Sequence, residues 1–165
     1  ARLRGATSFV PNHLYGKFMM QIPNELFFKW VEEELAAGHH VRFRLKGYSM
    51  LPFLRNEKDD VVLYPCTEAE LSPMDVVLFR YKGKHLLHRI IRKEGKELLI
   101  QGDGSFYTKE RCAVDDVVGK LKVIIRPSGK SLPVESLQWR LYSQIWLRIG
   151  CLRSPLLRIF HFIYR

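Results

Sequence analysis

The chain has 165 residues, of which 47% are hydrophobic, so it is long enough to bury one core of ordinary size. Lysine and arginine outnumber aspartate and glutamate by 27 to 17, and the net charge of +10 favours anionic partners. The three cysteines lie far apart in the sequence, which argues against a disulfide framework and against a zinc site. We therefore expect a reducing compartment, no metal and no cofactor.

Residues 1–23 form an N-terminal segment in which basic and apolar residues are mixed. No apolar run of the length found in a secretory signal peptide follows the early charges. No segment reaches the roughly 18 apolar residues that a membrane-spanning helix needs. The expected location is cytoplasmic or peripheral to a membrane.

Residues 24–38 have the periodicity of a helix that buries one face. Asn24 is placed to cap its start and Gly38 to end it. The apolar face consists of Leu26, Phe27, Trp30, Val31 and Leu35. Packing of this face against a sheet is the expected role.

Residues 41–46 alternate apolar with basic side chains, which is the pattern of a half-buried strand. The strand leads into residues 47–52 (GYSMLP), where Gly47 permits unusual dihedral angles and Pro52 stiffens the exit. A serine held on such a turn, here Ser49, presents its hydroxyl in a fixed direction, as a nucleophile must. A plain loop between two strands is the alternative.

Further runs rich in branched and aromatic residues predict strands at 60–64, 75–81, 85–91, 97–101 and 117–126. Gly83 and Gly95 lie between runs and mark hairpin turns. Short strands separated by frequent turns indicate a mainly β domain, a coiled antiparallel sheet that closes toward a half-barrel or a sandwich. With its leading helix, this domain is expected to cover residues 24–130.

Three motifs occur in a fixed order: Gly-x-Ser-Met-x-Pro at 47–52, His-Arg-Ile at 88–90 and Gly-Asp at 102–103. This order, over about residues 41–126, resembles the serine peptidase superfamily of type I signal peptidases and SOS-type (LexA-type) repressor autoproteases. The histidine is similar to that of the endoplasmic-reticulum-type branch, whereas the bacterial enzymes usually use a Ser/Lys pair. The resemblance implies a signal-peptidase-like fold and a serine endopeptidase that cleaves a peptide or precursor leader at small residues.

The resemblance implies catalytic roles for Ser49 as nucleophile, His88 as general base and Asp103 as the acid on the other imidazole nitrogen. His88 should lie within hydrogen-bonding reach of Ser49, or slightly beyond it without a ligand. From the residues alone, a core histidine and an Asp-Gly hairpin turn are the alternatives. Some family members use an acid several residues later, but at that spacing this chain has Thr108-Lys109-Glu110 instead of paired aspartates, so Asp103 is favoured.

The chain departs from the family pattern at two further positions. Gly47 stands where some signal peptidases place a serine hydroxyl for the oxyanion, so the backbone N–H of Ser49 is the expected donor. The turn before the strand at 75–81 is usually Gly-Asp in the family, whereas Met74 precedes Asp75 here. Most type I signal peptidases also carry an N-terminal membrane anchor, which is not visible in this sequence.

The tail, residues 131–165, is basic and predicts two amphipathic helices, the second beginning at Ser154 and Pro155. Residues 137–165 combine five arginines with aromatic and aliphatic stripes and hold no acid, which suits an anionic membrane surface. Docking of Trp139, Trp146 and Phe160 on the domain, or of the helices on a second copy, is the alternative. Nucleic acid is not expected, because no helix-turn-helix or RNA-binding motif accompanies the tail.

Besides the peptidase, two other functions stay open at this stage. One is a repressor-type module that cleaves itself or only binds, although a single predicted helix before the sheet is too little for a helix-turn-helix. The other is a non-catalytic basic protein that binds a membrane.

Overall fold

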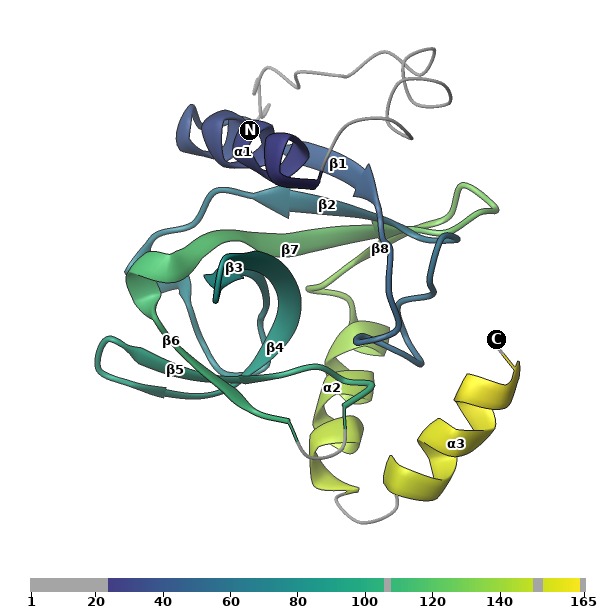
Figure 1. Ribbon diagram of the computed structural model, residues 1–165. Helices are drawn as coiled ribbons and strands as arrows, with labels where there is room; N and C mark the ends of the chain where they lie inside the picture. The colour runs from purple at the N-terminus through teal and green to yellow at the C-terminus, as the bar shows by residue number, and fades with distance from the viewer. Residues whose placement is uncertain (1–23, 106–107, 150–152, 164–165) are drawn as a thin grey trace.

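The protein is described here by a computed structural model that covers residues 24–105, 108–149 and 153–163 (Figure 1). The described part of the chain is mainly β, as predicted, with one α-helix before the strands and two after them. The helices are α1 (Asn24–Ala36), α2 (Leu137–Arg148) and α3 (Arg153–Ile163). The strands are β1 (Val41–Arg44), β2 (Asp60–Tyr64), β3 (Val76–Tyr81), β4 (Lys84–Glu94), β5 (Glu97–Gln101), β6 (Glu110–Ala113), β7 (Val117–Ile125) and β8 (Ser131–Pro133).

The strands form one antiparallel sheet in the order β1-β2-β7-β3-β4-β5-β6, and β8 pairs with β7. The register shifts at three places, in the pairs of β2 with β7, β3 with β7, and β4 with β5. Such irregularities bend a strand and increase its twist. The sheet accordingly curls round β3 and β4 into a half-barrel (Figure 1), which confirms the predicted fold class.

Helix α1 lies along β1 and β2 on one side of the sheet (Figure 1). Its residues Val31 and Leu35 are buried, and a Cβ atom added to Gly119 of β7 would lie 2.8 Å from Leu35 Cδ1. The missing side chain at Gly119 therefore allows the helix to pack closely on the sheet. Gly38, with φ of +87°, ends the helix as predicted, because glycine tolerates this left-handed conformation.

Two large apolar clusters fill the two faces of the curled sheet. The first lies between α1, the sheet and α2 and includes Phe43, Leu87 and Trp139. The second lies inside the curl of β3 to β6 and includes Phe79 and Ile90. Leu87 and Ile90 lie on opposite faces of β4, as side chains alternate along a strand, so β4 contributes to both clusters.

Helices α2 and α3 pack their inner faces on the domain. Trp139 and Trp146 of α2 are almost fully buried, as is Leu157 of α3, while Phe160 is half-buried. The two tryptophans therefore belong to the core and are not part of an exposed stripe. No helix in the described part of the chain is both long enough and apolar enough to cross a membrane.

Candidate active site

The loop after β1, residues 45–56, which we call the serine loop, runs from β1 toward α2 and then returns toward β2 (Figure 1). Gly47 adopts a φ of +117° and donates its N–H to Asn56 Oδ1 at 2.7 Å. The N–H of Leu51 donates to Tyr48 O at 3.2 Å and closes a turn around Ser49. Ser49 is exposed on this turn, as a nucleophile that meets a substrate must be.

Apolar side chains on both sides of the turn fix the serine loop to the rest of the molecule. Met50, Leu51 and Leu54 are at most 1% exposed. Leu51 packs with Trp146 and Leu157, so the loop is held directly by α2 and α3. The position of Ser49 is therefore set by packing and not only by the turn.

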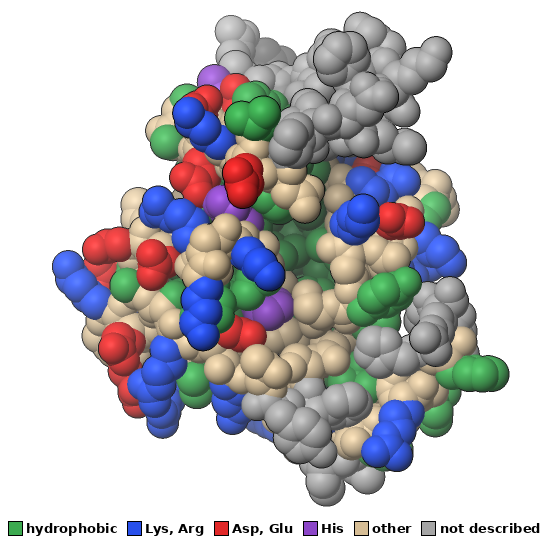
Figure 2. Space-filling view, viewed as in Figure 1, with side chains coloured by type: hydrophobic (Ala, Val, Ile, Leu, Met, Phe, Trp, Pro, Cys, Tyr) green, Lys and Arg blue, Asp and Glu red, His purple; other side chains and the backbone are tan. Residues whose placement is uncertain are grey.

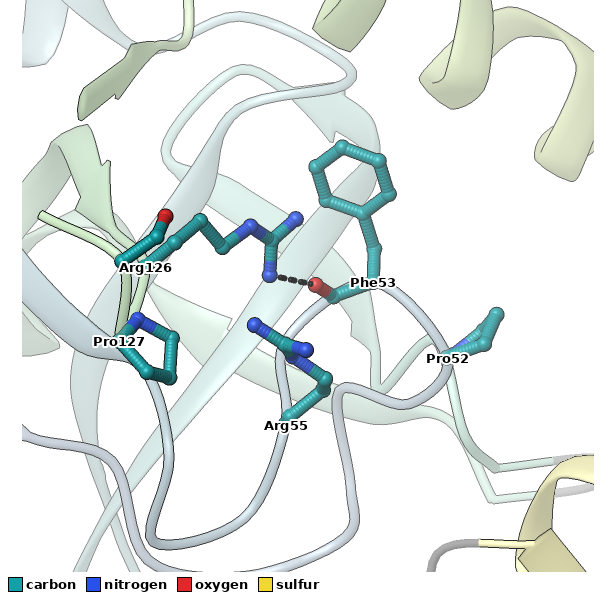
Figure 3. Close-up of a pocket in the computed structure, with 6 residues that line it drawn as sticks. Pro52, Phe53, Arg55, Arg126 and Pro127 are labelled. Carbon is teal, nitrogen blue, oxygen red and sulfur yellow. Dashed lines mark hydrogen bonds between the residues drawn. The ribbon is translucent and has the colours of Figure 1, made fainter. Parts of the chain in front are cut away.

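The far end of the serine loop is held by an arginine pair (Figure 3). Arg126 donates to Phe53 O at 2.8 Å, and both Arg126 and Arg55 pair with the fully buried Asp59. The two guanidinium groups border a recess of about 510 Å³ that neither Ser49 nor His88 lines. This recess lies apart from the residues that carry the candidate chemistry, and we assign it only a structural role.

Residues 102–104, between β5 and β6, lie directly against the serine loop. Gly104 donates its N–H to Ser49 O at 2.8 Å. A Cβ atom on Gly102 would lie 2.5 Å from Ser49 O and 3.1 Å from His88 Nε2. Since real Cβ atoms do not approach backbone oxygen this closely, only glycine fits at this position. The backbone carbonyl of Ser49 and His88 Nε2 therefore both border Gly102.

His88 lies on β4 and is 5% exposed. Its side chain points to the same side of the strand as the cluster inside the curl, and its ring centroid lies 5.9 Å from that of Phe79. Its Nδ1 lies 3.2 Å from Glu110 Oε2. Its Nε2 is buried and has no hydrogen-bond partner among the described residues, Ser49 included. The imidazole is thus oriented by a carboxylate on one nitrogen, and its other nitrogen faces the segment that touches Ser49.

The electrostatic surroundings keep His88 neutral near pH 7. Burial lowers the pKa of its imidazole below the ordinary value of 6.5, and the neighbouring Glu110 carboxylate opposes this effect only partly. A neutral imidazole with its proton on Nδ1 leaves Nε2 free to accept a proton. Nε2 can therefore take up a proton.

Asp103 does not make the contact that was predicted for it. Its carboxylate accepts two hydrogen bonds from Arg89, at 2.8 Å from Nε and 2.7 Å from Nη2. Both side chains are buried, at 0% exposure for Arg89 and 1% for Asp103. Because Arg89 follows His88 on β4, its side chain points to the opposite face of the strand and draws Asp103 away from the imidazole. Glu110 takes the place expected for Asp103.

The ion pair of Arg89 and Asp103 is closed off by α2 and α3. Arg89 also donates to Met74 O at 2.8 Å and to Ser143 Oγ at 2.7 Å, and lies 5.0 Å above the Trp139 ring. The carboxylate accepts a further bond from the Tyr142 hydroxyl, and burial together with this carboxylate raises the pKa of Tyr142.

The backbone of Asp103 is held from the same side. Its carbonyl oxygen accepts from Trp146 Nε1 at 3.1 Å and from Arg153 Nη2 at 3.3 Å. Since the neighbouring Gly102 and Gly104 touch Ser49, the two helices fix the segment that lines the candidate nucleophile. Arg89 and the inner face of α2 had no predicted role in the site.

Figure 2 shows that the front of the molecule is hollowed at its centre, over the curled sheet. Apolar side chains line the hollow, and a histidine is visible beside it. Among the described residues, no group of three histidine, cysteine, aspartate or glutamate side chains lies close enough together to hold a metal ion.

Comparison of the chain with protein-family models and with curated protein sequences finds no match, so the functional assignment rests on this geometry.

Proposed function

We propose that the protein is a serine peptidase in which Ser49 is the nucleophile, His88 the general base and Glu110 the acid that orients His88. The observation that carries the proposal is that the backbone of Ser49 and His88 Nε2 both border Gly102, with Glu110 on Nδ1. The motif order of the sequence supports the same reaction and makes a peptide or a precursor protein the expected substrate.

In the proposed reaction, Ser49 Oγ attacks the carbonyl carbon of the scissile peptide bond while His88 Nε2 takes the hydroxyl proton. The leaving amine receives that proton from His88, and an acyl group remains on Ser49. Water then attacks the acyl carbon and gives a proton to His88. His88 passes that proton to Ser49 Oγ as the acyl–oxygen bond breaks, which releases the new carboxyl end of the peptide and restores the enzyme. Because Ser49 is exposed and His88 is buried, the substrate would enter over the serine loop.

Glu110 is the proposed orienting acid in place of Asp103. A carboxylate that accepts from Nδ1–H fixes the tautomer in which Nε2 can act as a base, and it stabilises the imidazolium that forms. Asp103 becomes a positioning residue, since it fixes the Gly102–Gly104 segment through Arg89 and α2. The backbone N–H of Ser49 is the proposed oxyanion donor, because Gly47 supplies no hydroxyl.

The test is cleavage of a defined mixture of peptides, followed by mass spectrometry, with the full chain and matched variants. Ser49→Ala and His88→Ala should each remove nearly all cleavage, and the double variant should lose little more, since residues that act as a unit are non-additive. Ser128→Ala, which changes a serine remote from His88, should cleave like the parent protein.

Full cleavage by Ser49→Ala would overturn the proposal. If only the protein itself is cut, at a fixed position and in a Ser49-dependent way, the repressor-type alternative holds instead. If no variant and no parent protein cleaves any peptide, the non-catalytic alternative gains support.

A further inference from the structure

The outward face of α2 is apolar and has no partner within the described residues. Leu137, Leu141 and Ile145 recur every four residues, so they lie on one face of the helix. They are between 48% and 71% exposed, whereas Trp139 and Trp146 on the inner face are almost fully buried. The helix therefore carries a second apolar face that the domain does not use.

Helix α3 repeats this arrangement. Its Leu157 is fully buried against Trp146 and Leu51, which fixes which side of the helix faces the domain. The opposite side carries Leu156, Ile159 and Phe162, and Phe162 is 88% exposed. Apolar surface of this extent on a small protein marks an interaction site. We use the name outer face for these six exposed residues, which face away from the domain on two helices that contact each other through Trp146 and Leu157.

The helices that carry the outer face hold arginines and no acidic side chain, and the nearest acid in sequence is Glu135, just before α2. Residues 136–165 contain five arginines and neither aspartate nor glutamate. Arg140 and Arg148 of α2 and Arg158 of α3 are exposed, and no carboxylate of the described residues pairs with them. Figure 2 shows apolar and basic side chains next to one another over the region of α3.

We propose that the outer face docks on an anionic lipid bilayer, with its apolar side chains inserted between the lipids and its arginines on the headgroups. Exposed aliphatic and aromatic groups bordered by arginine match the interface of such a bilayer in both polarity and charge. This docking goes beyond the proposed peptidase activity and does not depend on it.

A second copy of the chain fits this surface less well. The net charge of +10 opposes self-association, and an interface formed by two outer faces would bring unpaired arginines together. Anionic lipid instead supplies the charge that the arginines lack.

The bilayer would lie close to the candidate nucleophile. Because Leu51 of the serine loop packs with Trp146 and Leu157, α3 is attached beside the turn that carries Ser49. Docking of the outer face therefore places the serine loop across α3 from the lipid, about one helix diameter (10–12 Å) away, where a substrate attached to the same membrane is concentrated.

Sedimentation with vesicles tests the proposal, using the full chain with Ser49→Ala so that catalysis plays no part. Vesicles of phosphatidylcholine mixed with phosphatidylserine should bind the protein, and raised salt should weaken binding. Arg148→Gln with Arg158→Gln should lower the partition coefficient about fivefold for each arginine removed. Ile159→Ser with Phe162→Ser should also lower it, through loss of apolar insertion.

Matched control variants change the same kinds of residue elsewhere. Arg92→Gln with Arg111→Gln removes two exposed arginines of the sheet, and Leu26→Ser removes an exposed leucine of α1. Both controls should bind vesicles like the parent protein, and circular dichroism should show that every variant is folded.

Equal binding by all variants, or binding to phosphatidylcholine alone with no effect of phosphatidylserine, would overturn the proposal. The proposal would also be overturned if the parent protein did not bind vesicles but sedimented as a dimer, and if Ile159→Ser with Phe162→Ser made that dimer dissociate. A second copy of the chain would then cover the outer face.

Discussion

Replacing Asp103 by asparagine should distinguish its role from that of Glu110, the other acid near His88, because the two carboxylates make different contacts. Asp103→Asn keeps the shape of the side chain but removes the charge that neutralises Arg89. Arg89 is 0% exposed, so it cannot recover that interaction from water. Glu110→Gln, in contrast, keeps an oxygen that can accept from His88 Nδ1–H at the 3.2 Å contact.

The expected magnitudes follow from these contacts. Breaking one partner of a buried ion pair lowers the free energy of unfolding by about 3–5 kcal/mol. Arg89 keeps its bonds to Met74 O and Ser143 Oγ, so we expect the lower end, about 3 kcal/mol, for Asp103→Asn. Glu110→Gln should change the free energy of unfolding by less than about 1.5 kcal/mol, since a hydrogen bond remains possible.

Activity should respond in the opposite order. Without the Glu110 charge the imidazolium is no longer stabilised, so kcat should fall by about 10²–10⁴-fold. Folded Asp103→Asn should keep more activity, because the pair of His88 and Glu110 remains. The assays are urea unfolding followed by tryptophan fluorescence, and peptide cleavage at a temperature where both variants are folded.

A double variant provides the control. Arg89→Met with Asp103→Leu removes both charges, so it should be more stable than Asp103→Asn, since no buried charge is left unpaired. The reasoning is refuted if Asp103→Asn unfolds like the parent protein and loses more activity than Glu110→Gln. In that case Asp103 would be the orienting acid, as the family pattern implies.

Three further changes test other parts of the site. The cleavage rate should fall at acid pH with a midpoint below 6.5, because burial lowers the pKa of His88. Glu110→Gln should move that midpoint lower still, since it removes one of the two carboxylates that raise this pKa, the other being Asp103. A midpoint above 6.5 in a pH–rate profile would contradict this. Gly102→Ala should reduce both cleavage and unfolding free energy, because its Cβ would lie 2.5 Å from Ser49 O, and parent-like values would show that the two segments are not in contact. Met74→Gly should stabilise the protein by about 1 kcal/mol or less in thermal unfolding, because Met74 has a φ of +78°, and destabilisation would mean that its side chain packs usefully.

The sheet was largely predictable because its strands carry clear patterns. The run at 60–64 and the run at 97–101 match β2 and β5 to the residue. Strands β6 and β8 were not predicted. Strand β6 is only four residues long and has two charged side chains, and β8 is only three residues long. Their pairing comes from neighbouring strands, which a local pattern does not contain.

The candidate site was predictable only as far as the motifs extend. Ser49 and His88 stand in motifs, and the structure brings both to Gly102. Whether Asp103 or Glu110 contacts His88 depends on which of the two carboxylates binds the buried Arg89. That in turn depends on His88 and Arg89 pointing to opposite sides of β4. The spacing of Glu110 was a usable signal, whereas the contacts of α2 with Asp103 join residues about 40 apart in sequence and carry no local signal.

The bond from Trp146 to Asp103 also sets when the site can form as the chain is made. Proteins are synthesised from the N-terminus, so Ser49, His88 and Glu110 leave the ribosome before α2 and α3 do. Until Trp146 and Leu157 have emerged, Leu51 has no partner and the Gly102–Gly104 segment lacks its clamp. A nascent chain therefore carries every proposed catalytic group before the site is assembled, and the site is completed only after α2 and α3 have been translated.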